Sequence, residues 1–157
     1  MSIMFVEPII KQIHTLLAAG LGTKLDAIDT EKGDFALADI AVYFEAEKIL
    51  IEQFPSIEIF PVDSPGEDYT AYSVRCDHRI AVRVHAAGDD EEVIFKSVWR
   101  YLRAITELLK TNDRLTQTVD LCRFDGHSYA PIDIYQGGTY IYAGTAFFII
   151  DQEEQIQ

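Results

Sequence analysis

The stretch HRIAVRVHAAGDDEEVIF (residues 78–95) decides the fold, because the hydrophobic period changes within it. Up to residue 87, apolar and polar side chains alternate at period two, as in a strand with one buried face. After Gly88, four acids begin a segment whose apolar residues recur at helical spacing. The sequence therefore predicts a long strand over residues 72–87, a tight turn at Gly88 and a helix over residues 89–110.

The predicted strand has two chemically different faces. We expect the core-facing parity to hold Val74, Cys76, His78, Ile80, Val82, Val84 and Ala86. The opposite parity holds Arg75, Asp77, Arg79, Ala81, Arg83, His85 and Ala87. Because this second set is rich in charge, we expect that face to meet solvent or a partner.

The predicted helix over residues 89–110 begins with acids that suit a helix N-terminus. Asp89 or Asp90 is a preferred N-cap, and Glu91 and Glu92 in the first turn favour the positive end of the helix dipole. Its apolar stripe consists of Ile94, Val98, Tyr101, Leu102, Ile105, Leu108 and Leu109, bordered by Trp99. Burying seven such side chains contributes roughly 10–20 kcal/mol before entropy, so the helix must pack on a sheet or another helix. The opposite face carries Lys96, Arg100, Arg103, Glu107 and Lys110, and it either is solvated or meets an acidic partner.

The rest of the chain supplies further helices and strands. We expect a helix over residues 7–19 that ends at Gly20 and Gly22, a second short helix from Thr23 to Gly33, a short strand SIEIFPV (56–62) and a loop DSPGED (63–68). Residues 117–135 suggest two short strands around an Asp125-Gly126 turn, followed by a turn at Gly137-Gly138, a strand over 139–150 and a loose tail over 151–157. The strand over 139–150 is apolar on both faces, so it is either central in a sheet or covered by another subunit. The fold class is therefore α+β, a single domain with a mostly antiparallel sheet packed on one long helix, with helices at the N-terminus.

Composition excludes several classes of protein. The formal net charge of −13 argues against tight nucleic-acid binding, which needs a basic surface. No apolar run is long enough to span a membrane, so we expect no membrane partner. Cys76 and Cys122 are expected to be reduced core thiols, since nothing resembles an export signal. An acidic binding module that mimics nucleic acid remains an alternative, although its acids are scattered.

The sequence contains no strong catalytic or ligand-binding motif. The sequence has no phosphate-binding glycine loop, no nucleophile elbow and no metal-ligand spacing among its histidines. A small metal-dependent enzyme would have to use His85 with residues Asp89–Glu92. Because helix-start chemistry accounts for all four acids, we expect no enzyme, no cofactor and no metal.

The order of the elements, together with IEIFPVDS (57–64) and HRIAVRVHAAGDDEEV (78–93), resembles the tail terminator and tail-completion proteins of long-tailed bacteriophages. The resemblance covers about residues 7–150 and rests on the order and size of the elements more than on a strict motif. It implies a structural virion protein that forms a ring, usually of six copies, caps the tail tube and stops its polymerisation. Another neck ring protein, such as a head-tail connector or stopper, is the alternative.

This resemblance also implies partners and surfaces. The partners would be further copies of the chain, the tail tube protein and a head-side connector or stopper, with DNA passing only as cargo through an acidic channel. The chain would be assembled in the host cytoplasm and end in the virion. A subunit interface would involve Phe147, Ile149, Tyr140, Tyr142, Arg79 and Arg83. A loop carrying Asp63, Glu67, Asp68 and Tyr69 would reach the tube.

Overall fold

A computed structural model describes residues 6–48, 50–112, 115, 121–130, 133–135 and 138–155 of the chain. Its elements, in chain order, are α1 (Val6–Lys32), β1 (Val42–Phe44), β2 (Ser56–Asp63), β3 (Gly66–Thr70), β4 (Ser73–Gly88), α2 (Glu91–Thr111), β5 (Leu121–Tyr129), β6 (Asp133–Tyr135) and β7 (Thr139–Gln155). These elements confirm the α+β class with a mostly antiparallel sheet.

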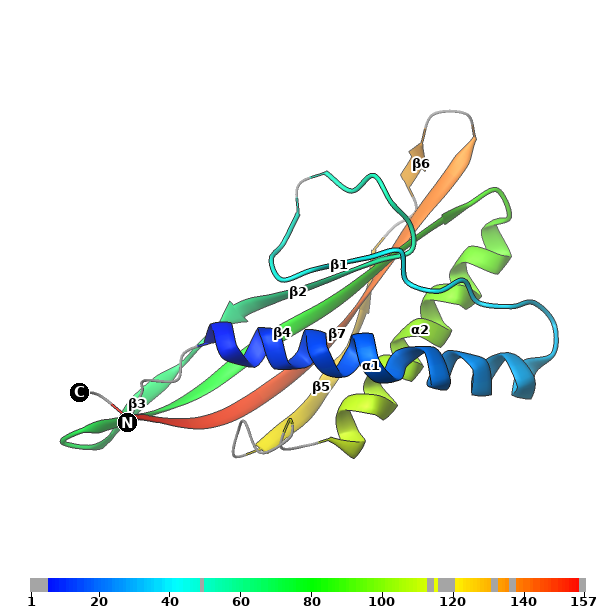
Figure 1. Ribbon diagram of the computed structural model, residues 1–157. Coiled ribbons are helices and arrows are strands. Elements are labelled where there is room, and N and C mark those ends of the chain that lie inside the picture. The colour runs from blue at the N-terminus through cyan, green and yellow to red at the C-terminus, as the bar shows by residue number, and fades with distance from the viewer. Residues whose placement is uncertain are drawn as a thin grey trace.

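One twisted sheet contains all the described strands, in the order β1-β2-β4-β7-β5 (Figure 1). β4 and β7 are its centre, and they pair in antiparallel register along their whole length, from Ser73 opposite Gln155 to Gly88 opposite Tyr140. β3 extends the sheet beside the first residues of β4, and β6 pairs with the first residues of β7. β1 is the exception to the antiparallel pattern, since it pairs with β2 in parallel.

Both helices lie on the same side of this sheet (Figure 1). α2 packs on β4, β7 and β5, while α1 packs on α2 and β2. The closest approach is at Gly144 of β7, where an added Cβ would lie 2.6 Å from Val98 and 2.7 Å from Leu102. The face that meets the helices carries the fully buried Ile80, Val82 and Val84, as the strand parity predicts. We call the other side of the sheet the open face.

The first helix corrects the sequence interpretation. α1 runs without a break through Gly20 and Gly22, where we expected one helix to end and a second to begin. Its buried stripe continues past both glycines as Leu17, Leu21, Leu25 and Ile28. Gly20 packs closely on α2, since an added Cβ would lie 3.0 Å from Leu108. The helix ends at Gly33, whose positive φ of 66° suits a residue without a Cβ.

The second half of the chain holds further corrections. Asp125-Gly126 is not a hairpin turn, because β5 continues through it with a register shift between Phe124 and His127 that marks a bulge. Residues 66–68 of the expected loop belong to β3. Residues 151–155 of the expected tail continue β7 and pair with β4, because β4 begins early enough to give them a partner. Residues 117–120, 137, 156 and 157 lie outside the described residues.

The two described helices do not have the character of membrane-spanning segments. Over the described ranges, neither helix combines the length and the apolar character that crossing a bilayer requires.

Candidate assembly surfaces

Four of the six residues expected at a subunit interface lie together on the open face. Arg79 is directly opposite Ile149, and Arg83 is opposite Thr145, with Phe147 between them on the same face of β7. The guanidinium of Arg79 lies 4.7 Å from the centre of the Phe147 ring, and that of Arg83 lies 4.8 Å from the Phe60 ring. Phe147 and Ile149 are only half-buried, although they sit near the middle of the sheet. No helix covers them in the part of the chain that the structure describes.

The other two expected interface residues lie on the opposite face. Tyr142 is 7% exposed and packs edge-on against Phe95 of α2, with ring centres 4.6 Å apart. Tyr140 packs against the same core and is partly buried. Since side chains alternate along β7, Tyr140 and Tyr142 cannot share a surface with Phe147. We therefore assign Tyr142 to the core and correct that expectation.

A close contact between His85 and a buried carboxylate lies on the open face. The Nδ1 of His85 lies 3.0 Å from Oε1 of Glu58, whose side chain is fully buried. The backbone N–H of Lys48 donates to the other carboxylate oxygen of Glu58 at 2.7 Å. Burial raises the pKa of Glu58, but His85, the Lys48 N–H and Arg83 outweigh it, so the pKa lies below its usual value. This network fixes the segment between β1 and β2 against the sheet, helped by an Arg83–Glu47 ion pair at 3.1 Å.

The acids after Gly88 serve the start of α2. Asp90 is the N-cap, and its carboxylate accepts a hydrogen bond from the N–H of Val93 at 3.2 Å. Glu92 pairs with Lys96 one turn along the helix. His85 pairs with Glu58 rather than with these acids, and the described residues contain no group of three or more metal-binding side chains placed to hold an ion. The metal-enzyme hypothesis therefore lacks a site in this part of the chain.

Two other polar features also have structural roles. His78 is 3% exposed, and its Nδ1 lies 2.8 Å from the hydroxyl of Ser64, in line with a core histidine. Part of the basic face of α2 is paired within the chain. Arg100 is 8% exposed and binds both carboxylate oxygens of Asp34, while Arg103 pairs with Glu31. The acidic partners of these two arginines are Glu31 of α1 and Asp34, which follows that helix.

The residues expected to touch the tube lie on a projecting arm. β3 and the first residues of β4 form a hairpin that extends beyond the helices, beside the end of β7 (Figure 1). Glu67, Asp68 and Tyr69 are exposed on this arm, with Tyr69 57% exposed, and Asp63 is exposed at the end of β2 that leads into it. The structure thus brings these four residues to one end of the molecule.

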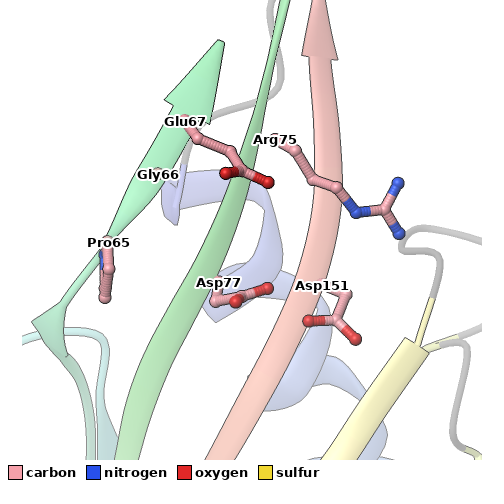
Figure 2. A pocket seen from close by; sticks show the side chains of 6 residues that line it. All are labelled: Pro65, Gly66, Glu67, Arg75, Asp77 and Asp151. Atoms are coloured by element: carbon pink, nitrogen blue, oxygen red, sulfur yellow. The ribbon is translucent and has the colours of Figure 1, made fainter. Parts of the chain in front are cut away.

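A shallow acidic hollow of about 450 Å³ lies on the open face of this arm. Figure 2 shows its lining, with Asp77 of β4 and Asp151 of β7 on neighbouring strands and Glu67 and Arg75 above them. A hydrogen bond to Asp151 is the main cause that raises the pKa of Asp77. Burial raises the pKa of Asp151, but the effects of Asp77 and Arg123 are larger, so the pKa of Asp151 is lowered overall. The two neighbouring carboxyl groups therefore influence each other's titration.

Sequence reasoning missed an aromatic stripe at the junction of α2, β7 and β5, which is exposed at Trp99, Tyr129 and Phe124 but buried at Tyr142. Its members are Trp99, Phe95, Tyr142, Tyr129, His127 and Phe124, and successive ring centres lie 4.6–6.5 Å apart. Trp99, Tyr129 and Phe124 are 49%, 51% and 40% exposed. Burial lowers the pKa of His127, whose Nε2 lies 2.9 Å from the hydroxyl of Thr106. The only signal in the sequence was the density of aromatic residues between positions 124 and 129.

Comparison with known proteins gives little further guidance. No protein-family model matches the chain, and no curated protein matches it. Among solved structures, the chain is similar to one from the virion of a native gene transfer agent particle, with 13% sequence identity and a TM-score of 0.34. That match covers 88% of this chain and 94% of the other. A TM-score this low does not establish a common fold.

Proposed function

We propose that the chain is a structural virion-assembly protein that forms a ring, caps a phage-like tail tube and joins it to the head-side neck. The observation that carries the proposal is the open face, where Phe147 and Ile149 are half-buried at the centre of the sheet and Arg79 and Arg83 flank them. A central strand with apolar side chains on a face that no described helix covers is typical of a surface that is completed by another protein. The long strand β4 followed directly by the long helix α2, which is part of the family resemblance, also occurs in the structure.

The arm and the net charge support the same proposal. An exposed hairpin that ends in Tyr69 and Tyr72, which are 57% and 75% exposed, offers aromatic contacts to a neighbouring protein such as the tube. A net charge of −13 would let DNA pass through a ring without adhering to its wall. The aspartate-lined hollow on the arm adds to this negative surface.

Electron microscopy of the purified chain, alone and with polymerising tail tube protein, tests the proposal. A terminator is expected to form rings, and the rings should sit at one end of tubes and limit their length. Rings that ignore tubes but bind a head-side portal or connector would instead indicate another neck protein. A chain that stays at the monomer mass of 17.8 kDa and leaves tube length unchanged would contradict the proposal.

A further inference from the structure

The outer edge of β5 is unpaired among the described strands. β5 lies at the end of the sheet, and no described strand pairs with its outer side. The backbone N–H of Ala130 donates to the carbonyl oxygen of Ala143 on β7 at 2.9 Å, so the backbone polar groups of Ala130 point inward. Because these groups alternate along an antiparallel strand, the N–H and C=O of Tyr129 point outward. An exposed edge of this kind is a template for a strand from another chain.

Aromatic side chains follow this free edge. Phe124, His127 and Tyr129 stand on the helix side of β5, and all three side chains are exposed. Trp99 extends the stripe onto α2. Aromatic residues are enriched in protein interfaces, where they supply much of the binding free energy. A strand that paired with β5 would place its own side chains against these rings.

The opposite side of the same sheet carries a second free edge. β1 pairs only with Ser56–Glu58, so the outer side of Ile59–Asp63 in β2 has no strand partner among the described residues. Strand direction alternates from β2 through β4 and β7 to β5, since each of these neighbours is antiparallel. A second copy in the same orientation, with its β2 beside β5, would therefore continue the antiparallel order.

The side chains at the two edges are compatible. Val62 is 44% exposed at the β2 edge and offers apolar surface. Asp63 is opposite Arg79 in the β2–β4 pairing, and Arg123 is opposite Ile149 in the β5–β7 pairing, so both charges lie on the open face. Arg123 pairs with Asp151 of β7 at 3.3 Å but is about half exposed, so its other N–H groups can reach a carboxylate of a neighbouring chain. Opposite charges at the two edges would fix which strands meet.

We propose that the outer edge of β5 binds the outer edge of β2, residues Ile59–Asp63, from a second copy of this chain. The contact joins two different surfaces of each copy, so it repeats from one copy to the next and closes into a ring when the rotation permits. This inference rests on the proposed function in one respect, because it supplies the lateral contact of the proposed ring.

Two substitutions at Tyr129 separate the contribution of its backbone N–H to self-association from the contribution of its side chain. Tyr129→Ala keeps the outward N–H and removes the ring, and it should weaken self-association by about tenfold or more. Tyr129→Pro also removes the N–H and should abolish self-association, while an edge strand tolerates proline without loss of its own pairing. Analytical ultracentrifugation measures the association, and thermal unfolding verifies that both variants fold. Self-association of Tyr129→Pro at the wild-type level would overturn the inference.

Mixing two variants tests whether the contact joins β5 to β2. Val62→Lys places a charge at the β2 edge and leaves β5 intact, so each of Val62→Lys and Tyr129→Pro should be monomeric alone. An equimolar mixture should form a species of twice the monomer mass and nothing larger, because one intact edge remains on each chain. A Val62→Lys protein that still forms the wild-type oligomer would show that β5 pairs with something other than β2.

Failure of this inference differs from failure of the proposed function. If the wild-type chain forms rings through β5 but never caps tubes, the contact stands and the terminator function does not. If the wild type caps tubes and Tyr129→Pro does so equally well, the function stands and the contact is wrong. A wild-type chain that is monomeric at every concentration, without tubes and with them, contradicts both.

Discussion

Arg100 binds both carboxylate oxygens of Asp34, with N–O distances of 2.8 and 2.9 Å. Asp34 follows the end of α1, and Arg100 lies on α2, so this pair ties the two helices together. The Phe35 ring lies 4.3 Å from the same guanidinium, which leaves Arg100 8% exposed. A planar guanidinium suits such a site because it forms two parallel hydrogen bonds with one carboxylate.

Asp34→Asn should lower the melting temperature, because it leaves the mostly buried Arg100 without a charged partner. The matched control is Glu92→Gln, which removes an exposed i,i+4 pair with Lys96 and should change the melting temperature less. Arg100 holds the pKa of Asp34 well below its usual value of 3.8, so the pair stabilises the fold above that pH and the effect is lost as pH falls below it. Equal melting temperatures for the two variants at pH 7 would show that the Asp34–Arg100 pair is dispensable.

Gly144→Ala should lower the free energy of unfolding by about 1–3 kcal/mol, because the new methyl group would overlap Val98 and Leu102 of α2. Gly22→Ala is the control with the opposite sign. An added Cβ at Gly22 meets nothing within 4 Å, and alanine favours a helix interior by about 0.8–1 kcal/mol over glycine. Urea denaturation measures both variants. A neutral Gly144→Ala would mean that α2 does not sit this close to β7.

Glu58→Gln should destabilise the protein by roughly 1–3 kcal/mol at pH 7, since it removes the charged acceptor for the Lys48 N–H and for His85. The folded-state pKa of Glu58 is below the usual 4.5, so its stabilising effect is present above pH 4.5 and is lost as pH falls through the folded value. The difference between wild type and variant should therefore shrink below pH 4.5. The variant should also be cleaved faster by protease between residues 45 and 54, and unchanged cleavage would argue against this anchoring role.

The sequence predicted the central part of the fold because its signals are local. The change of period at Gly88 located β4 and α2 within one or two residues. Gly20 was misread because a glycine that ends a helix and one that accommodates Leu108 of a packed helix look alike in sequence. The Asp125-Gly126 bulge was misread for a similar reason, since only its pairing with β7 separates a bulge from a turn.

The candidate surfaces were harder to predict because they depend on which face the helices cover. Strand parity grouped Phe147 with Ile149 correctly, but the sequence could not show that α2 buries Tyr142 on the other side. The aromatic stripe combines Trp99 of α2 with Tyr129 of β5, which are distant in sequence and meet only through tertiary packing. Which strands form the edges of a sheet likewise cannot be predicted until the strand order is known.

Phe147→Ser should impair assembly more than stability, because its ring is half-buried on the open face and contacts Arg79 rather than the core. Tyr142→Ala is the contrasting variant, and it should lower the free energy of unfolding by about 3–5 kcal/mol, as for other large aromatic residues removed from a core. Thermal unfolding measures the stability of each, and cosedimentation with tail tubes measures assembly. If Phe147→Ser bound tubes and neighbouring copies as the wild type does, the open face would not be an assembly surface. If Tyr142→Ala instead unfolded no more readily than the wild type, the face assignment of β7 would be reversed.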